Sequence, residues 1–431
     1  MAACVLSRRP EDEIQPSIYG HYSRKRSVIT SPSLYKSAIA LLSWVANSRL
    51  AILNPDKNIL LRWMIRILIY DHFCAGTKAA EVRDTISGIK KMGYSGVILC
   101  YGKEIILHDP SSGDGSLSAS GSDMRASPEK QIAQWLDGQL ETLKYISAGD
   151  FIGIKYTGAG PEVVNALAEG RDLPPQVLEA MDIICKQAAA QGSSIWIDAE
   201  QQALQPTIDA WTIDLMRRYN RDGTALISNT IQAYLKGARR SVENHLRIAQ
   251  REGWSLGIKL VRGAYIEKEV RSLIHDTKEG TDSSYNGIVR DLLCKSWPGF
   301  KEESFPDTHL FLAGHNPESI RMACETVRTR VKSGKKVGVL RFGQLQGMAD
   351  EVSCKLLQQG EEARNCDGLS EDEAAIQRQM APMAYKCLNW GSVQESMQFL
   401  LRRAIENRGA TERMRAAFPE LKAELRRRML F

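Results

Sequence analysis

The sequence predicts an α/β protein built as a (βα)8 barrel of the TIM type, preceded by an N-terminal helical arm. Short β-rich apolar runs recur along most of the chain, and a longer helical pattern follows each of them. The runs are continuously apolar rather than alternating, which is typical of parallel strands that are covered by helices and packed inside a barrel. The strand candidates are 95–102, 151–158, 194–200, 225–234, 256–265, 308–316, 336–343 and 384–391.

An open doubly wound sheet is the alternative fold. A dinucleotide-binding unit of that kind carries G-x-G-x-x-G after an early strand. The nearest stretch, TGAGPEVV at 157–164, lacks the third small residue and contains a proline, and the sequence has no Walker A motif. The motif content therefore favours the barrel.

Composition and charge place the chain among ordinary globular proteins. Of its 431 residues 43% are apolar and 25% charged, and its net charge of +6 comes from interleaved acidic and basic residues. A nucleic-acid binder usually concentrates positive charge on one face, so nucleic acid is not expected as a partner. The 9 cysteines are scattered without a CxxC pair, which is typical of reduced thiols in an intracellular protein.

The residues before the predicted barrel form two segments of different composition. Residues 1–32 form a disordered, targeting-like segment, but acidic residues interrupt its basic ones, so its role as a presequence is ambiguous. Residues 33–93 form the helical arm, with helical patterns at 33–47, 57–73 and 79–92. The second pattern is apolar all round, which predicts packing on both sides.

The rest of the chain is the predicted barrel and a tail. The barrel spans 94–410, with a flexible Ser/Gly/Asp-rich insertion at 108–130. Residues 411–431 are expected to form a basic helix that either packs on the protein or anchors to a membrane surface. No apolar run reaches the roughly 18 residues needed to cross a bilayer, so we expect no membrane span, while peripheral association stays open.

Charged residues gather where predicted strands end. Lys155, Asp198 and Lys259 each lie at or near such an end, and barrel enzymes carry their chemistry on that rim. Taken singly, each has an ordinary explanation, such as a solvated strand terminus or a helix N-cap. Together with Arg402 and Arg403 on the last helix of the barrel, they predict a basic rim that suits an anionic guest, such as a carboxylate or a pyrophosphate.

Metal chemistry is not expected. Asp198, Glu200 and His315 can be drawn as a carboxylate–histidine set, but Asp198 and Glu200 share a face only if their strand continues that far. The sequence has no HExxH motif and no paired Cys/His spacing. A G-x-S-x-G nucleophile motif is absent as well.

Several blocks occur in the order of one known family. They are LNPDKN and FCAGTKAAEV near the start, then IWIDAE, NTIQAYLKGA, KLVRGAYIEKE, FGQLQGMAD and RRAIENRGA. Over roughly residues 50–410 the sequence resembles the proline dehydrogenase (proline oxidase) family in its fungal, monofunctional form. The resemblance implies an FAD-dependent oxidoreductase of proline catabolism, which oxidises L-proline to Δ1-pyrroline-5-carboxylate by hydride transfer to flavin N5. It also implies a quinone electron acceptor and a place on the matrix side of the mitochondrial inner membrane, with a cytoplasmic location left open.

The resemblance also implies which residues form the site. Asp198 is expected to hold Lys155 in place, and Lys259 to supply a cation near the flavin ring. The expected FAD-binding residues are Gln232, Lys259, Val261, Gly263, Ala264, Tyr265, His315, Asn316, Arg403 and Glu406. The expected substrate-binding residues are Lys155, Asp198, Leu345, Cys387, Phe399, Arg402 and Arg403.

Two of these positions depart from the family pattern. Cys387 stands where the last strand normally carries a tyrosine, and Phe399 replaces the tyrosine of the YLxRR motif. Both changes remove a phenol from the predicted pocket wall, which opens 4-hydroxyproline or another ring-substituted cyclic amino acid as the substrate. Two further alternatives remain: a flavin-free lyase or aldolase that uses Lys155 as a Schiff-base amine, and an inactive paralogue that serves as an interaction module.

Overall fold

The computed structural model describes residues 32–48, 50–103, 105–107, 117–119, 126–266 and 269–406. This part of the chain divides into two compact units, one of which is Cys74–Trp390 and the other 32–73 together with 391–406. The predicted targeting-like segment 1–32, apart from Pro32, and the predicted C-terminal helix 411–431 lie outside the described residues. So does most of the predicted insertion 108–130.

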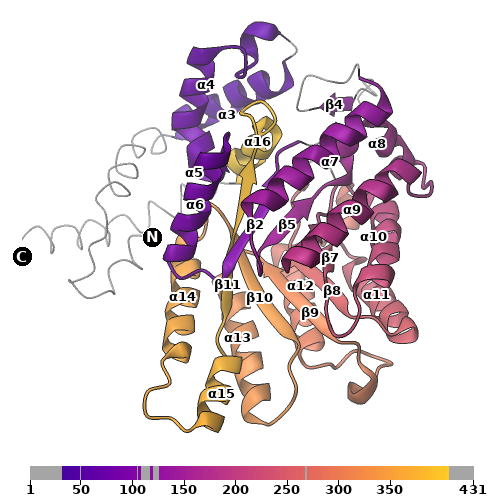
Figure 1. The fold of residues 1–431 in the computed structure, drawn as a ribbon, viewed down its shortest axis with the longest axis vertical. Helices are drawn as coiled ribbons and strands as arrows, with labels where there is room; N and C mark the ends of the chain where they lie inside the picture. The colour runs from indigo at the N-terminus through magenta and orange to yellow at the C-terminus, as the bar shows by residue number, and fades with distance from the viewer. Residues whose placement is uncertain are drawn as a thin grey trace, which may run out of the picture. The chain divides into compact units, whose positions relative to one another are not determined.

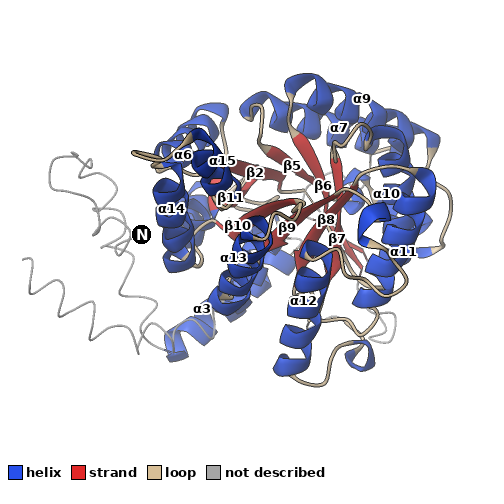
Figure 2. Ribbon diagram, turned by 90° about the horizontal axis from the view of Figure 1, so that it is seen from below, coloured by secondary structure: helices blue, strands red, loops and turns tan. Residues whose placement is uncertain are grey.

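The first unit is a closed barrel of parallel strands (Figures 1 and 2). Each strand pairs in parallel with the next in chain order, and β11 pairs with β2 to close the ring. The barrel strands are β2 (Gly96–Tyr101), β5 (Phe151–Ile154), β6 (Ser194–Ile197), β7 (Ile227–Gln232), β8 (Leu256–Val261), β9 (Thr308–Ala313), β10 (Val339–Leu345) and β11 (Met383–Trp390). All eight strand candidates and the predicted fold class are therefore confirmed.

Helices surround this barrel, as Figure 2 shows. They are α6 (Ala79–Lys91), α7 (Pro128–Tyr145), α8 (Pro161–Ala168), α9 (Pro175–Gln191), α10 (Gln205–Tyr219), α11 (Ala238–Glu252), α12 (Lys278–Leu293), α13 (Pro317–Lys332), α14 (Asp350–Arg364) and α15 (Glu371–Gln379). Left-handed glycines at Gly192 and Gly253 end α9 and α11 and turn the chain into the next strand.

Three short strands complete this unit. β1 (Cys74–Gly76) pairs with β11 outside the ring. β3 (Ile105–Leu107) and β4 (Leu117–Ala119) form an antiparallel pair that brackets the first part of the predicted insertion.

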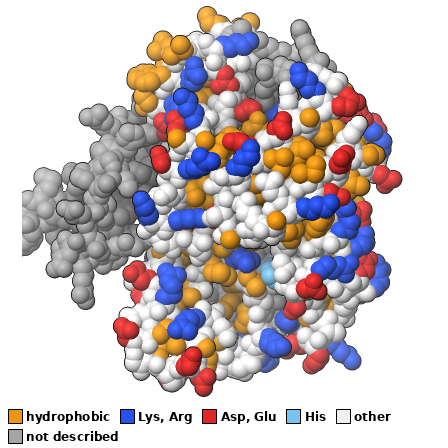
Figure 3. All heavy atoms as spheres, viewed as in Figure 1, with side chains coloured by type: hydrophobic (Ala, Val, Ile, Leu, Met, Phe, Trp, Pro, Cys, Tyr) orange, Lys and Arg blue, Asp and Glu red, His pale blue; other side chains and the backbone are white. Residues whose placement is uncertain are grey.

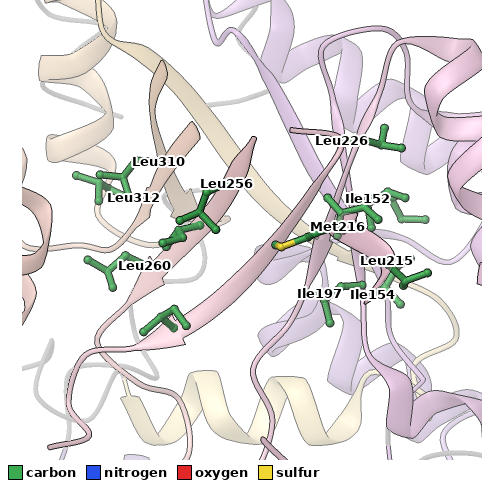
Figure 4. Packing of buried hydrophobic residues seen from close by; sticks show 14 of the residues in the cluster. Ile152, Ile154, Ile197, Leu215, Met216, Leu226, Leu256, Leu260, Leu310 and Leu312 are labelled. Atoms are coloured by element: carbon green, nitrogen blue, oxygen red, sulfur yellow. The ribbon is translucent and has the colours of Figure 1, made fainter. Parts of the chain in front are cut away.

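The two faces of each barrel strand bury different side chains, because successive residues of a strand point to opposite sides. Ile152 and Ile154 of β5 belong to the large cluster between strands and helices, part of which Figure 4 shows. Phe151 of the same strand belongs instead to a second cluster that fills the barrel, together with Ile98, Cys100, Trp196, Phe311 and Tyr385. Trp196 and Phe311 meet edge to face with ring centroids 4.4 Å apart. Burial on both faces explains why the strands read as continuous apolar runs.

The second unit joins the two ends of the described chain. It contains α3 (Pro32–Asn47), the 3-10 turn η1 (Ala51–Leu53), α4 (Ile59–Ile65), the π-helical turn η2 (Arg66–Tyr70), α5 (Asp71–Phe73) and α16 (Met397–Glu406). Helices α3 and α16 contact each other. The Tyr70 hydroxyl donates a 2.6 Å hydrogen bond to the Gly391 carbonyl oxygen, which fixes the end of η2 to the segment before α16.

The helical stretch predicted at 57–73 forms, but the prediction that it packs on both sides is wrong. Ile65 and Tyr70 are buried, while Ile59 and Trp63 are 75% and 60% exposed. An apolar face open to solvent in the described chain has the same sequence pattern as one that is covered by a neighbour, so composition could not separate the two cases.

Candidate functional site

Two lysines share one aspartate at the C-terminal ends of three barrel strands, β5, β6 and β8. Lys155 follows β5, Asp198 follows β6, and Lys259 lies near the end of β8. The Lys155 Nζ atom lies 3.0 Å from Asp198 Oδ2, and Lys259 Nζ lies 2.5 Å from Asp198 Oδ1. Both oxygens of the Asp198 carboxylate are therefore engaged, and the three groups together carry one excess positive charge.

This Lys–Asp–Lys triad sits on the aromatic filling of the barrel. The side chains of Lys155, Asp198 and Lys259 are 12%, 14% and 10% exposed, and Lys259 Nζ lies 4.3 Å from the centroid of the Trp196 ring. Burial by itself would raise the pKa of Asp198, but the charges of Lys259 and Lys155 outweigh it and lower that pKa below its usual value. Asp198 is thus an anion held between two cations; it does not cap a helix, since the N-cap of α10 is Leu204.

A second set of contacts ties the same strand ends together through hydrogen bonds. The Glu200 carboxylate accepts two hydrogen bonds from Thr157. The Thr157 backbone N–H donates one of them at 3.2 Å, and the Thr157 hydroxyl donates the other over a shorter distance. The Gln232 amide then donates to the Glu200 carbonyl oxygen at 3.3 Å and accepts from the Ala264 backbone N–H at 3.2 Å. We call Thr157, Glu200, Gln232 and Ala264 the rim belt, because they link the ends of β5, β6, β7 and β8 in turn.

The tip of β8 is packed more tightly than its sequence suggested. Val261, the last residue of the strand, pairs with Gln232 of β7. A Cβ atom on Gly263 would collide with the Tyr234 ring, so this position requires glycine for packing within the chain itself. The close approach of a cofactor, which we expected from the sequence, stays a prediction for Gly263. Tyr265 follows it and is buried.

The ends of β9 and β10 bring three further predicted residues together. His315 Nε2 accepts a hydrogen bond from the Leu345 backbone N–H at 3.3 Å, so a neutral His315 carries its proton on Nδ1. Asn316 caps helix α13, because its side-chain oxygen accepts hydrogen bonds from the backbone N–H groups of Glu318 and Ser319. The Asn316 side chain therefore has a structural task that the sequence analysis did not assign.

Cys387 faces a second thiol inside the barrel. It pairs across the sheet with Leu345 on one side and Ile98 on the other, and it packs against the cluster that contains Cys100. The interaction between the two buried thiols raises the pKa of Cys100 and lowers that of Cys387. Cys100 was missed by the sequence analysis, since only the register of β2 against β11 shows that it is a neighbour of Cys387.

The remaining predicted residues lie on α16, in the second compact unit. Arg403 is buried; its guanidinium lies 2.5 Å from Glu406 Oε1 and 5.1 Å from the centroid of the Phe399 ring. Arg402 precedes it on the same helix. The expected convergence of both arginines on Lys155 concerns two separate units and stays a prediction.

Thr157 and Trp196 contribute to the site although sequence reasoning assigned them no role there, and Glu200 was considered only as an acidic residue of the rim. One signal was available, because Trp196 lies on β6 two residues before Asp198, and alternate residues along an extended chain point to the same side. The partnership of Thr157 with Glu200 joins two residues 43 positions apart, and nothing in either local sequence indicates it.

Comparison with curated proteins finds relatives of similar sequence. The chain is 32% identical over 263 residues to a probable mitochondrial proline dehydrogenase of Schizosaccharomyces pombe, an alignment that covers 58% of this chain and 50% of that protein. It is 31% identical over 262 residues to the human mitochondrial proline dehydrogenase 1, covering 58% and 38%, and 32% identical over 265 residues to a mouse hydroxyproline dehydrogenase, covering 59% and 52%. The matched part thus spans about half or less of each relative.

Solved structures and a family model agree with these relatives. The barrel resembles proline utilization A from Bdellovibrio bacteriovorus inactivated by N-propargylglycine, with a TM-score of 0.63 and 14% identity over 90% of this chain and 38% of that one. At this identity the likeness concerns the fold alone. The family model described as proline dehydrogenase matches residues 82–416, which include all barrel strands, the Lys–Asp–Lys triad and α16. The chain therefore belongs to the proline dehydrogenase family.

Proposed function

We propose that this chain is an FAD-dependent dehydrogenase that oxidises L-proline, or a ring-substituted proline, to the corresponding cyclic imine. One observation carries the proposal: two ammonium groups share a single carboxylate over the aromatic floor of the barrel. The excess positive charge lies where water is largely excluded, and there it attracts a substrate carboxylate more strongly than it would at an exposed surface. Membership of the family supports the same chemistry.

The residues near the triad suit a flavin. FAD, when bound, supplies the group that accepts the hydride. Lys259 offers a cation close to where negative charge would develop, and the rim belt fixes Gln232 and Ala264 beside it. We propose that these residues hold the cofactor together with Val261, Gly263, Tyr265, His315, Asn316, Arg403 and Glu406.

The substrate roles divide between both units. We propose that Lys155 binds the substrate carboxylate with Arg402 and Arg403, and that Asp198 orients Lys155 through their 3.0 Å ion pair. Leu345, Cys387 and Phe399 would form the apolar wall against the ring. Lys155 is already engaged by Asp198 in this ion pair, which argues against its use as a Schiff-base nucleophile.

The function is tested on the purified chain reconstituted with FAD. We expect yellow absorbance that bleaches when proline or 4-hydroxyproline is added without oxygen, and turnover when an artificial electron acceptor is present. Protein that binds no flavin, even after refolding with FAD, would contradict the proposal and favour the inactive paralogue.

Cys387 is expected to shift the choice of substrate. A thiol in place of a tyrosine enlarges the pocket opposite the carboxylate, so proline loses packing worth about 1–3 kcal/mol, and an added hydroxyl is rejected at most about a hundredfold. Cys387→Tyr should therefore raise the ratio of kcat/KM for proline over trans-4-hydroxyproline by about tenfold or more. Steady-state assays of the wild type and Cys387→Tyr with both substrates check this.

The matched control is Cys324→Tyr on α13, a buried thiol outside the barrel, which should destabilise the protein without a change in that ratio. The same substrate preference in wild type and Cys387→Tyr would exclude Cys387 as the specificity position.

We further propose that the protein is mitochondrial and that its electrons pass to a quinone at a membrane surface. The relatives named as mitochondrial support the first part. Within the described ranges, none of the helices has both the length and the apolar character needed to cross a bilayer.

The apolar face of α4 and η2 suits contact with a membrane surface. Along 59–68 every exposed position carries an apolar side chain: Ile59, Leu60, Trp63, Met64, Ile67 and Leu68. Figure 3 shows hydrophobic side chains gathered over α4. Lys57, Arg62 and Arg66 lie beside this face, where they would meet anionic lipid headgroups.

Replacing Leu60 and Trp63 with Glu should abolish membrane binding. Each apolar side chain contributes about 1.5–3 kcal/mol when buried, so we expect partitioning into phosphatidylcholine vesicles that contain phosphatidylglycerol to fall by about 100-fold or more. Cosedimentation measures this, with Ile183→Glu, an exposed site on α9, as the control. Unchanged cosedimentation of the double variant would contradict the assignment of this face.

A further inference from the structure

We propose that Glu200 is a positioning residue, which sets the place of Lys155 by holding the turn that follows it through Thr157. This assignment rests on the proposed function insofar as Lys155 binds the substrate carboxylate. It adds a residue and a contact that the predicted site does not include.

Lys155 stands between two attachments to the loop that carries Asp198. On its N-terminal side, the Asp198 backbone N–H donates a 2.9 Å hydrogen bond to the Ile154 carbonyl oxygen. On its C-terminal side, Thr157 donates two hydrogen bonds to the Glu200 carboxylate. The ion pair between Lys155 and Asp198 lies between these two attachments, so its geometry depends on both.

The contact with Glu200 is built to be stiff. Glu200 is only 3% exposed, and a buried carboxylate that accepts two hydrogen bonds holds its donors more strongly than a neutral acceptor does. Its own backbone is fixed as well, because its N–H donates to Gln205 Oε1 at 3.0 Å and its carbonyl oxygen accepts from Gln232. The backbone of Glu200 is thus fixed by contacts that do not involve Thr157.

Thr157 lies in a short turn whose other end is already fixed, so its contact with Glu200 is what fixes its own end of the turn. It belongs to the 3-10 turn η4 (Tyr156–Ala159), whose N-cap is Lys155. The Lys155 carbonyl oxygen accepts a 3.1 Å hydrogen bond from Trp135 Nε1, which fixes the start of the turn. Loss of the Thr157 hydroxyl would loosen the other end, so the Lys155 side chain would sample positions away from Asp198.

Glu200 also connects the two halves of the predicted site. Through Thr157 it acts on the substrate-binding Lys155, and through Gln232 it acts on Ala264 at the tip of β8, where we propose the cofactor. The Glu200 carboxylate makes the contact with Thr157, whereas the Glu200 backbone carbonyl makes the contact with Gln232. A substitution that removes the contact with Thr157 can therefore disturb Lys155 while the β8 tip stays in place.

The test compares Thr157→Val, which removes the hydroxyl at nearly constant volume, with Thr157→Ser, which keeps it. On FAD-loaded protein with an artificial acceptor, we expect Thr157→Val to raise KM for proline about tenfold with kcat and flavin absorbance nearly unchanged. Thr157→Ser should stay within about twofold of wild type. If Thr157→Val behaves as Thr157→Ser does, the hydroxyl contact has no positioning role.

A cycle with Lys155→Met separates positioning from general stability. If Thr157→Val acts through Lys155, it should raise KM in the wild-type background and add nothing in the Lys155→Met background. An equal effect in both backgrounds would show a role that does not pass through Lys155 and would overturn the proposal.

A measurement without catalysis keeps this inference distinct from the proposed function. Brief acetylation with acetic anhydride, followed by peptide mass spectrometry, reports how firmly Lys155 is held by Asp198. We expect labelling of Lys155 to rise several-fold in Thr157→Val, but not in Thr157→Ser, with Lys90 as an internal reference. Equal labelling in all three proteins would overturn the inference even if proline is oxidised, whereas an inactive wild type with the expected labelling would overturn only the proposed function.

Discussion

Asp198→Asn is expected to lower kcat/KM for proline by about 100- to 5000-fold, because removal of one partner from a buried ion pair costs about 3–5 kcal/mol. Both carboxylate oxygens of Asp198 contact an ammonium group. Asparagine would keep one acceptor, but its NH2 group would face either Lys155 or Lys259 and repel it. Two cations would then stand side by side without their shared anion, and neither would keep its position.

Steady-state kinetics and flavin content measure this effect. Asp276→Asn is the matched control, since Asp276 pairs with Lys236 at 3.1 Å on the exposed surface, where such pairs contribute little. We expect it to leave both quantities unchanged. Activity of Asp198→Asn within about threefold of wild type would show that the triad is not part of the site.

The same residue predicts a pH dependence of stability. The lysines lower the pKa of Asp198 in the folded protein, so its contribution to stability is fully present above the unfolded-state pKa of about 3.9 and is lost as the pH falls toward the folded-state value. The difference in unfolding free energy between wild type and Asp198→Asn should therefore be constant from about pH 5 to 8 and shrink in more acidic solution. Denaturant unfolding at several pH values checks this, and a difference that titrates near neutral pH would contradict it.

Arg402→Met is expected to raise KM for proline by about 100-fold while FAD stays bound. A charge-assisted hydrogen bond to a carboxylate is worth about 1.5–3 kcal/mol, and methionine keeps the length of the side chain without its charge. Arg403 is paired with Glu406 on the same helix, so Arg402 is the arginine of the two whose removal disturbs that pair least.

Substrate titration and flavin absorbance separate the two effects. Arg321→Met on α13, an exposed arginine paired with Glu318 and Glu325, serves as the control and should leave KM unchanged. If Arg402→Met also leaves KM unchanged, the carboxylate is bound elsewhere and the predicted clamp is wrong.

Sequence patterns were sufficient for the fold and for part of the site. The barrel strands could be predicted because burial on both faces of a strand leaves a local trace, a continuous apolar run. Lys155, Asp198 and Lys259 could be placed on one rim because all parallel strands of a barrel end on the same side. The sequence predicted only that Asp198 pairs with Lys155. The pairing of Lys259 with Asp198, 61 positions away, could not be predicted, because it depends on how closely two strand ends approach in the closed barrel.

By itself the sequence determined the order of strands and helices, the family, and the kinds of charge that meet at the rim. Only the tertiary structure decided which charges share a partner, that Gly263 faces the Tyr234 ring, that Cys100 stands beside Cys387, and that Glu200 holds the turn after Lys155. It also decided that the apolar helix at 59–68 is exposed in the described chain. The physical reason is the same in each case: secondary structure follows from neighbours along the chain, whereas ion pairs, side-chain packing and exposure depend on residues that closure of the barrel or packing of the helices brings close.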